Sequence, residues 1–282
     1  MKRRSFIQSS ATLVAASPVS SLLASKEMSF IDTNVYLRQH PFRSLPLESP
    51  DALAARLRKI GVVSAWAAPI EALLHRDLDS LNEQHWKTCQ SSGDGLFLPI
   101  GAINPKLPGW RESLRRCHEV HGMKGVRIHP GYHGYDLNDP DFAHLLAAVK
   151  ERNLLLQLAP HMEDQRTQHP KVIVPPTNPT PLLKLLPKFP GLRFQIINGL
   201  RTINSGSLLK ILSEAGAHFD ISMLEGAAGI ARSVIPAERL CFGSFAPVFI
   251  PESASLKVVE SKPELNDARL RALCHSNAES LL

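Results

Sequence analysis

Hydrophobic and polar positions follow two alternating patterns along this chain. Short, mostly apolar segments typical of buried strands are separated by segments with an apolar residue every three or four positions, which are typical of amphipathic helices. The predicted strands cover residues 30–36, 62–67, 96–103, 123–129, 154–159, 192–198, 218–222 and 239–244. The predicted helices cover residues 51–59, 77–89, 110–118, 142–152, 181–188, 207–214, 226–234 and a last segment from 264 to the C-terminus.

Strands that alternate with helices indicate a parallel sheet with right-handed crossovers. Eight such units favour closure into a single α/β domain of the (β/α)8 type, a TIM barrel. The length of 282 residues fits one barrel or two small domains, so the repeat decides between them. An open doubly wound sheet is the competing architecture, but no Gly-x-Gly-x-x-Gly follows the first strand.

The N-terminus differs from the rest of the chain. Lys2, Arg3 and Arg4 precede Phe6 and Ile7, and a mildly apolar run follows. This pattern resembles a twin-arginine export signal, so we expect a signal over residues 1–27, a barrel over residues 28–282 and a periplasmic location. The alternative is a simple basic extension. The apolar run is too short and interrupted to span a bilayer, so we expect no integral membrane segment after signal removal.

Charge and cysteine content exclude several other classes of protein. Loss of the basic signal would lower the formal net charge from +6 to about +3. No cluster of Lys and Arg with interleaved aromatic residues is present, so we expect no nucleic-acid partner. The widely spaced cysteines form no CxxC pattern, which excludes a zinc finger and favours buried free thiols. Their positions are 89, 117, 241 and 274.

Polar residues stand at the predicted carboxyl ends of several strands. In a barrel these ends meet at one face, where barrel enzymes carry their chemistry. The residues concerned are Asn34 and Tyr36 on the first strand, Arg127 and His129 on the fourth, and Asn198 on the sixth. The loop at 38–43, which is basic and aromatic, would lie over the same face and suits contact with a substrate. The loop at 131–136 adds Tyr132 and could line the same pocket.

Several stretches, taken together and in order, resemble the landmarks of the amidohydrolase-related barrel family. They are Ile31-Asp32-Thr33-Asn34-Val35-Tyr36, Gly125-Val126-Arg127-Ile128-His129-Pro130, Phe242-Gly243-Ser244-Phe245-Ala246-Pro247 and Asn277-Ala278-Glu279-Ser280-Leu281-Leu282. The resemblance covers nearly the whole predicted barrel. It implies the barrel fold, and hydrolysis or decarboxylation of a small, anionic organic substrate.

The resemblance also implies that the family's usual metal centre is lost. Asn34 and Tyr36 stand where the family carries a His-x-His pair, and neutral amide and phenol groups are poor ligands for a divalent transition metal. Ala159, Asn198 and Phe245 stand where further ligands would be expected. We therefore expect metal-free operation and no cofactor.

The densest group of ionisable residues follows the fifth predicted strand, at 161–169. We expect His129 or His161 to act as general base, supported by Glu163 or Asp164. Arg127 and Arg166 would hold substrate charge, and the remaining pocket residues would be Asn34, Tyr36, Tyr132 and Asn198.

Three alternatives remain for this loop and its neighbours. The loop could be only a solvated connection. A divalent metal such as zinc could bind at a rebuilt site, composed of His129, His161, Glu163 and Asp164. The barrel could also be catalytically inactive and bind a small molecule or a partner protein. Catalysis requires His129 and segment 163–166 to converge on one cavity.

Overall fold

The computed structural model describes residues 28–47, 49–225 and 229–282. The predicted export signal at residues 1–27 lies outside the described residues. Among the helices that the structure describes, none has the length and apolar character needed to cross a membrane.

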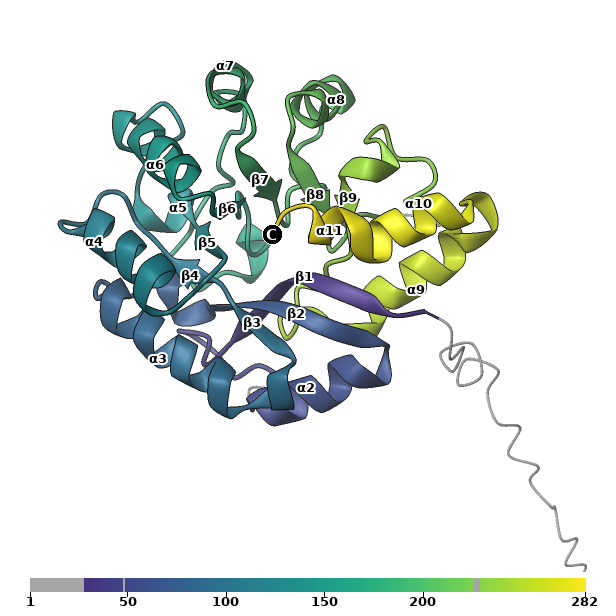
Figure 1. Cartoon of the computed structure of the whole chain (residues 1–282), viewed down its shortest axis with the longest axis horizontal. Helices are drawn as coiled ribbons and strands as arrows, with labels where there is room; N and C mark the ends of the chain where they lie inside the picture. The colour runs from purple at the N-terminus through teal and green to yellow at the C-terminus, as the bar shows by residue number, and fades with distance from the viewer. Residues whose placement is uncertain (1–27, 48, 226–228) are drawn as a thin grey trace, which may run out of the picture.

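The strands form a parallel ring with helices on its outside (Figure 1). They are β1 (Phe30–Leu37), β2 (Val62–Pro69), β3 (Phe97–Pro99), β4 (Gly101–Ala102), β5 (Gly125–Ile128), β6 (Leu155–Leu158), β7 (Arg193–Ile196), β8 (His218–Asp220) and β9 (Leu240–Cys241). The third predicted strand is interrupted at Ile100 and gives β3 and β4. Every pair of neighbouring strands is parallel, which confirms the predicted α/β barrel.

Two sets of backbone hydrogen bonds complete the ring. Ile100 N donates to Ala67 O at 2.7 Å and so bridges the interruption between β3 and β4. At the other junction, Thr33 N donates to Phe242 O at 3.0 Å and Tyr36 N donates to Ala246 O at 2.8 Å. The first strand is therefore held on both sides, and the barrel has no open edge there.

The outer helices largely follow the predicted pattern. They are α2 (Pro50–Lys59), α3 (Leu78–Ser91), α4 (Trp110–Arg115), α5 (Pro130–His133), α6 (Pro140–Glu151), α7 (Leu182–Leu185), α8 (Gly206–Glu214), α9 (Glu252–Ser261), α10 (Asp267–Arg271) and α11 (Asn277–Glu279). Side-chain caps begin four of them: Asp77 accepts from Ser80 N, Asp139 from Asp141 N, Ser205 from Leu208 N and Asn266 from Arg269 N.

The prediction of a helix at 226–234 is wrong over its described part, because residues 229–232 form a turn and residues 233 and 234 are not helical. Ser233 Oγ accepts a hydrogen bond from Ile235 N, and Pro236 disfavours helical geometry in the residue before it. The sequence also missed α9. Two of the buried residues of that helix are Ser255 and Ser261, so its apolar periodicity is weak.

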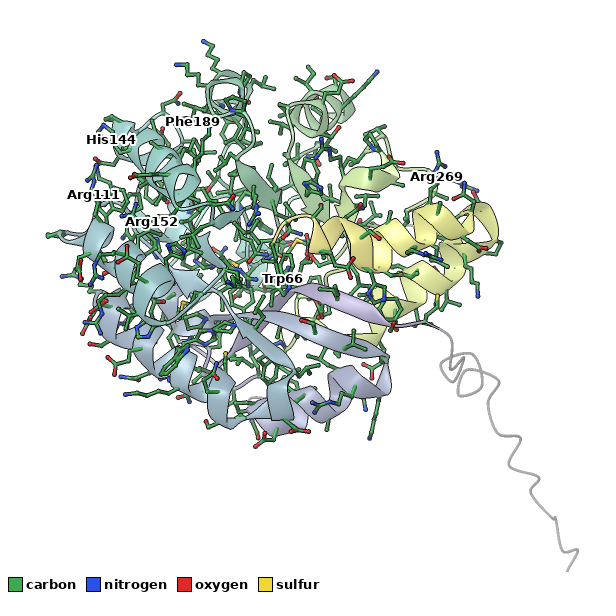
Figure 2. The ribbon with its side chains drawn as sticks, viewed as in Figure 1. Trp66, Arg111, His144, Arg152, Phe189 and Arg269 are labelled. Carbon is green, nitrogen blue, oxygen red and sulfur yellow. The ribbon has the colours of Figure 1, made fainter. Side chains whose placement is uncertain are left out.

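The apolar core lies mainly between the ring and the helices. The buried face of α6, for example, consists of Phe142, Leu145, Leu146 and Val149. Figure 2 shows Trp66 near the centre of the molecule, whereas Arg111, His144 and Arg269 lie at its periphery. All four cysteines are buried and free, as the sequence predicted.

Candidate functional site

The centre of the barrel is filled by a hydrogen-bonded layer around Arg127. Its guanidinium donates to Gln157 Oε1 at 2.9 Å and to Val35 O at 3.1 Å, and its carbon lies 4.4 Å from the centre of the Tyr36 ring. Gln157 in turn donates to Gln195 Oε1 at 2.8 Å. Arg127, Gln157 and Gln195 are all fully buried. Arg127, which was predicted to hold substrate, is thus enclosed and bound to the protein's own backbone.

A second buried layer lies at the carboxyl ends of β1, β7 and β8. The Asn34 amide donates to Asn198 Oδ1 at 2.6 Å and to Asp220 Oδ2 at 2.8 Å. Asn198 N donates to Asp220 Oδ1 at 2.8 Å, and Ser222 Oγ donates to Asn198 Oδ1 at 3.1 Å. Burial raises the pKa of Asp220, although hydrogen bonds from Ser222 and Asn34 oppose this effect. These contacts tie three strands together across the barrel.

Tyr36 and His129 form a buried pair above Arg127. The Tyr36 hydroxyl shares a hydrogen bond of 2.9 Å with His129 Nε2 and donates to Met162 Sδ at 3.4 Å. Burial lowers the pKa of His129 well below its ordinary value, and the nearby His133 and Arg127 lower it further. His129 is therefore neutral at neutral pH, and with 1% of its surface exposed it does not meet solvent.

Asp32 is a buried carboxylate beside these layers. Its Oδ1 accepts from Asn34 N at 3.1 Å and from Ser244 N at 3.0 Å, whereas Oδ2 has no partner. Burial raises the pKa of Asp32 to about 7, despite the hydrogen bonds from Ser244 and Asn34 that lower it. The close approach of backbone also explains Gly243, because a Cβ there would lie 2.7 Å from Asp220 Oδ2.

The residues that the family resemblance places at the metal positions do not fit a divalent transition metal. Asn34 uses its Nδ2 to donate to Asn198 and Asp220, and the Tyr36 hydroxyl is engaged by His129. A neutral amide oxygen and a phenol are poor ligands for such a metal, and the side chains of Ala159 and Phe245 bring only apolar atoms. Among the described residues, no group of three or more His, Cys, Asp or Glu side chains could hold a metal ion. The four residues of the alternative rebuilt site, all of them described, are therefore not assembled for coordination.

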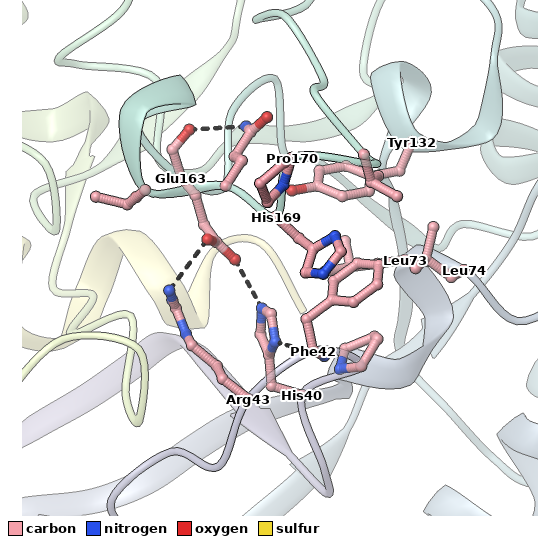
Figure 3. Close-up of a pocket in the computed structure, with 13 residues that line it drawn as sticks. His40, Phe42, Arg43, Leu73, Leu74, Tyr132, Glu163, His169 and Pro170 are labelled. Atoms are coloured by element: carbon pink, nitrogen blue, oxygen red, sulfur yellow. Dashed lines mark hydrogen bonds and ion pairs between the residues drawn. The ribbon is translucent and has the colours of Figure 1, made fainter.

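Open space lies above this packed interior, in a cavity of about 270 Å³ between two loops (Figure 3). We call it the rim pocket. The lining residues are His40, Pro41, Phe42, Arg43, Leu73, Leu74, Tyr132, Glu163, Thr167, Gln168, His169, Pro170 and Val172. Tyr132 and Glu163, both predicted site residues, line it, and the basic and aromatic loop at 38–43 forms one wall.

Glu163 joins the two loops of the rim pocket. His40 Nε2 lies 2.7 Å from Glu163 Oε1, and Arg43 Nη1 lies 3.2 Å from Glu163 Oε2. Burial alone would raise the pKa of Glu163, but the His40 hydrogen bond and the Arg43 charge outweigh it and lower the pKa. The Phe42 and His169 rings stack with centroids 4.8 Å apart and planes 14° apart. These contacts hold the pocket closed on one side (Figure 3).

Hydrogen bonds also assign the proton on His40. Phe42 N donates to His40 Nδ1 at 3.3 Å, so Nδ1 is an acceptor and Nε2 carries the proton that faces Glu163. Both ring nitrogens are engaged. His40 therefore shapes the pocket and presents no free base to it.

The remaining predicted residues lie elsewhere. His161 and Asp164 line a separate, open hollow of about 310 Å³ together with Arg201. Burial lowers the pKa of His161, and Arg201 adds to this effect. Arg166 is 84% exposed and pairs with Asp164 at 2.6 Å. The proposed catalytic set is thus spread over the buried interior, the rim pocket and this hollow.

Four residues of the rim pocket were missed as individual site residues: His40, Phe42, Arg43 and His169. The composition of the loop at 38–43 was the available signal for the first three. His169 stands at the end of the charged loop at 161–169. It stacks on Phe42, which lies 127 positions earlier in the chain, and no local sequence pattern predicts a contact between such distant residues.

Comparison with solved structures supports the fold. The chain is 14% identical to a 2,6-dihydroxybenzoate decarboxylase complexed with 2,6-dihydroxybenzoate, with a TM-score of 0.70, covering 90% of this chain and 99% of that chain. A 5-carboxyvanillate decarboxylase from Novosphingobium aromaticivorans, complexed with manganese and 4-hydroxy-3-methoxy-5-nitrobenzoic acid, gives 14% identity, a TM-score of 0.66, and coverage of 91% and 96%.

A dihydroxybenzoic acid decarboxylase from Polaromonas, with bound manganese and the inhibitor 2-nitroresorcinol, gives 13% identity, a TM-score of 0.70, and coverage of 90% and 96%. At these identities the likeness concerns the fold alone. No curated protein matches the sequence. The amidohydrolase family model matches residues 41–282, which is most of the chain. The chain therefore belongs to the amidohydrolase family.

Proposed function

We propose that this barrel binds a small organic molecule in the rim pocket and works without the family's metal centre. One observation carries the proposal: the rim pocket is open to ligand, whereas Asn34, Tyr36, Arg127 and Asn198 are fully buried and hydrogen-bonded to other side chains or to backbone. A molecule of substrate size has access to the first place and not to the second.

The chemistry of the rim pocket suits a planar acid. Phe42 and His169 present stacked flat rings, which favour an aromatic ligand. Lys171 N donates to His169 Nδ1 at 3.2 Å, so His169 Nε2 carries a proton and serves as a donor. Arg43 neutralises Glu163 and is itself partly exposed, so its remaining N–H groups can meet a carboxylate. The benzoates and the resorcinol bound by the structural neighbours belong to the same class of molecule.

Metal-free hydrolysis or decarboxylation is the second candidate. The observation in its favour is that Glu163, a buried carboxylate with a lowered pKa, lines the same pocket as the Tyr132 hydroxyl. Burial raises the pKa of Tyr132, so its proton stays in place at neutral pH and can be donated in a hydrogen bond. Binding without turnover is preferred, because His129 and segment 163–166 do not meet in one cavity.

Ligand binding tests the proposal directly. Titration of the purified protein with 2,6-dihydroxybenzoate is expected to give saturable binding at one site, measured by calorimetry. Arg43→Gln is expected to weaken binding about tenfold or more, because a charge-assisted hydrogen bond is lost. Arg269→Gln, a change at an exposed arginine on α10, is the matched control and should bind like the parent protein. Binding that is absent, or equal in the parent and Arg43→Gln, rejects the proposed pocket. Release of CO2 in the same samples would favour the second candidate.

Metal analysis tests the other half of the proposal. The purified protein is expected to carry no stoichiometric zinc or manganese, and its melting temperature should stay unchanged after chelator or added manganese. The reason is that an amide and a phenol, Asn34 and Tyr36, stand where the family resemblance places imidazoles, and both are poor ligands for a divalent transition metal. One equivalent of metal that survives gel filtration and raises the melting temperature would contradict metal-free operation.

Export is a separate proposal that rests on the motif alone. Replacing Arg3 and Arg4 together by lysine is expected to leave the full-length chain inside the cell, because twin-arginine receptors read the paired guanidinium groups. Cell fractionation and immunoblotting measure the outcome. Unchanged appearance of a shortened chain in the periplasm would show that residues 1–27 do not act as this signal.

A further inference from the structure

The mouth of the rim pocket exposes apolar side chains from three separate segments. Pro41 and Phe42 come from the loop after β1, Leu74 from the turn after β2, and Pro170 from the loop after β6. Phe42 and Leu74 keep 42% and 41% of their surface exposed. We call these four residues the apolar collar. Apolar groups gathered around the entrance of a cavity favour contact with an apolar part of a ligand.

A second hollow is lined in part by residues of the same collar. This outer groove has a volume of about 490 Å³ and lies beside the collar. The two spaces share His40, Pro41, Phe42, Arg43 and Leu74. A ligand chain that extends out of the rim pocket over Phe42 and Leu74 therefore reaches residues that also line the outer groove.

The residues from the rim pocket to the outer groove form three zones of different polarity. The inside of the rim pocket carries Tyr132, Glu163 and His169, which suit a polar head group. The collar that follows is apolar. The far part of the outer groove is polar again, with Gln39, Glu71 and His75. The apolar stretch is thus limited in length.

We propose that the ligand is an amphipathic planar acid whose short apolar chain lies across Phe42 and Leu74. This inference rests on the proposed function, since it places the acidic head in the rim pocket. A chain of a few methylene groups gains from burial against the collar. A longer chain reaches Gln39, Glu71 and His75 and gains no further affinity. It would displace water from these polar groups, and this cost offsets the burial of additional methylene groups.

A series of 4-alkylbenzoates tests the inference: benzoate, then the methyl, butyl and octyl compounds, each below its critical micelle concentration. The dissociation constants of the parent protein, Leu74→Ser and Val120→Ser are compared by calorimetry. Val120 is also exposed but ends the helical segment before β5, at the opposite end of the strands, so it is the matched control. Leu74→Ser keeps the backbone and removes only collar surface.

In the parent protein and in Val120→Ser, affinity is expected to rise about twofold per added methylene up to butyl, as for a half-buried chain, and then to level off. In Leu74→Ser the dependence on chain length should largely disappear while benzoate still binds. Benzoate binding with no dependence on chain length in the parent protein overturns the inference and leaves the proposed function intact. The same dependence in Leu74→Ser also overturns it.

A series in which no member binds rejects the proposed pocket itself. A concentration-dependent dimer that Leu74→Ser abolishes, seen by analytical ultracentrifugation, would mean that a second copy covers the collar and would likewise overturn the inference.

Discussion

Replacing Arg127 by methionine is expected to lower the free energy of unfolding by about 3 kcal/mol. The substitution keeps the side-chain volume but removes the donors to Gln157 Oε1 and to the Val35 and Thr33 carbonyls. Each buried acceptor left without a partner costs about 1–3 kcal/mol, and relief of the desolvation cost of the guanidinium offsets part of the sum. Urea unfolding followed by circular dichroism measures the change.

Two further variants test whether the loss of stability comes from the Arg127 hydrogen bonds. Arg127→Lys keeps the positive charge but cannot reproduce the planar fork of donors, so we expect it to lose most of the same stability. Arg269→Met, at an exposed position, should stay within about 0.5 kcal/mol of the parent protein. If Arg127→Met is as stable as the parent, the Arg127 network contributes nothing to the barrel and the buried cation has another role.

The second large effect concerns pH. The pKa of Asp32 is raised by burial to about 7 in the folded protein, from an ordinary value of 3.8. The folded state therefore holds a proton more tightly than the unfolded state, and stability from this group is present below about pH 4 and is lost as the pH rises to about 7. From pH 5 to pH 8 the loss amounts to roughly 2–3 kcal/mol.

Asp32→Asn is expected to remove this dependence. The asparagine Oδ1 can still accept from Asn34 N and Ser244 N, so the two proteins should have similar stability at pH 5. At pH 8 the variant should be the more stable one, since it buries no charge. Unfolding curves at both pH values give the answer. A parent protein that gains stability relative to Asp32→Asn on going from pH 5 to pH 8 would mean that the Asp32 carboxylate is stabilised as an anion.

Local sequence patterns were sufficient for most of the barrel. Mostly apolar runs such as Leu155–Leu158, in which Gln157 is the polar residue, are buried on both faces, as parallel strands under helices require. The patterns failed where buried positions carry polar residues, and where apolar residues do not belong to a helix. Serines on the inner face of α9 concealed a helix, and apolar residues near Pro236 suggested one that the described residues do not contain.

The site was harder to predict because strand periodicity gives the face of a residue but not its depth in the barrel. Arg127 lies on β5 and His129 directly follows this strand, yet Tyr36 of β1 contacts both side chains. Gln157 of β6 also binds Arg127. The rim pocket depends on His40 meeting Glu163, which is 123 positions away. Contacts between loops that are so far apart in the sequence depend on the whole fold. The sequence therefore indicated both loops as parts of the site, but not that they contact each other.

Ring closure has a consequence for the order of folding. The Thr33 hydroxyl reaches Phe242 O over 209 positions, and these contacts give β1 its second neighbour. During synthesis β1 leaves the ribosome early, but its last partner emerges only when most of the chain has been made. Since contacts between distant positions cost the most chain entropy, we expect the pairs from β5 to β8 to form first and the seam at β1 to close last. Until then β1 has a free edge, which makes this strand the segment of the nascent chain most exposed to wrong pairing.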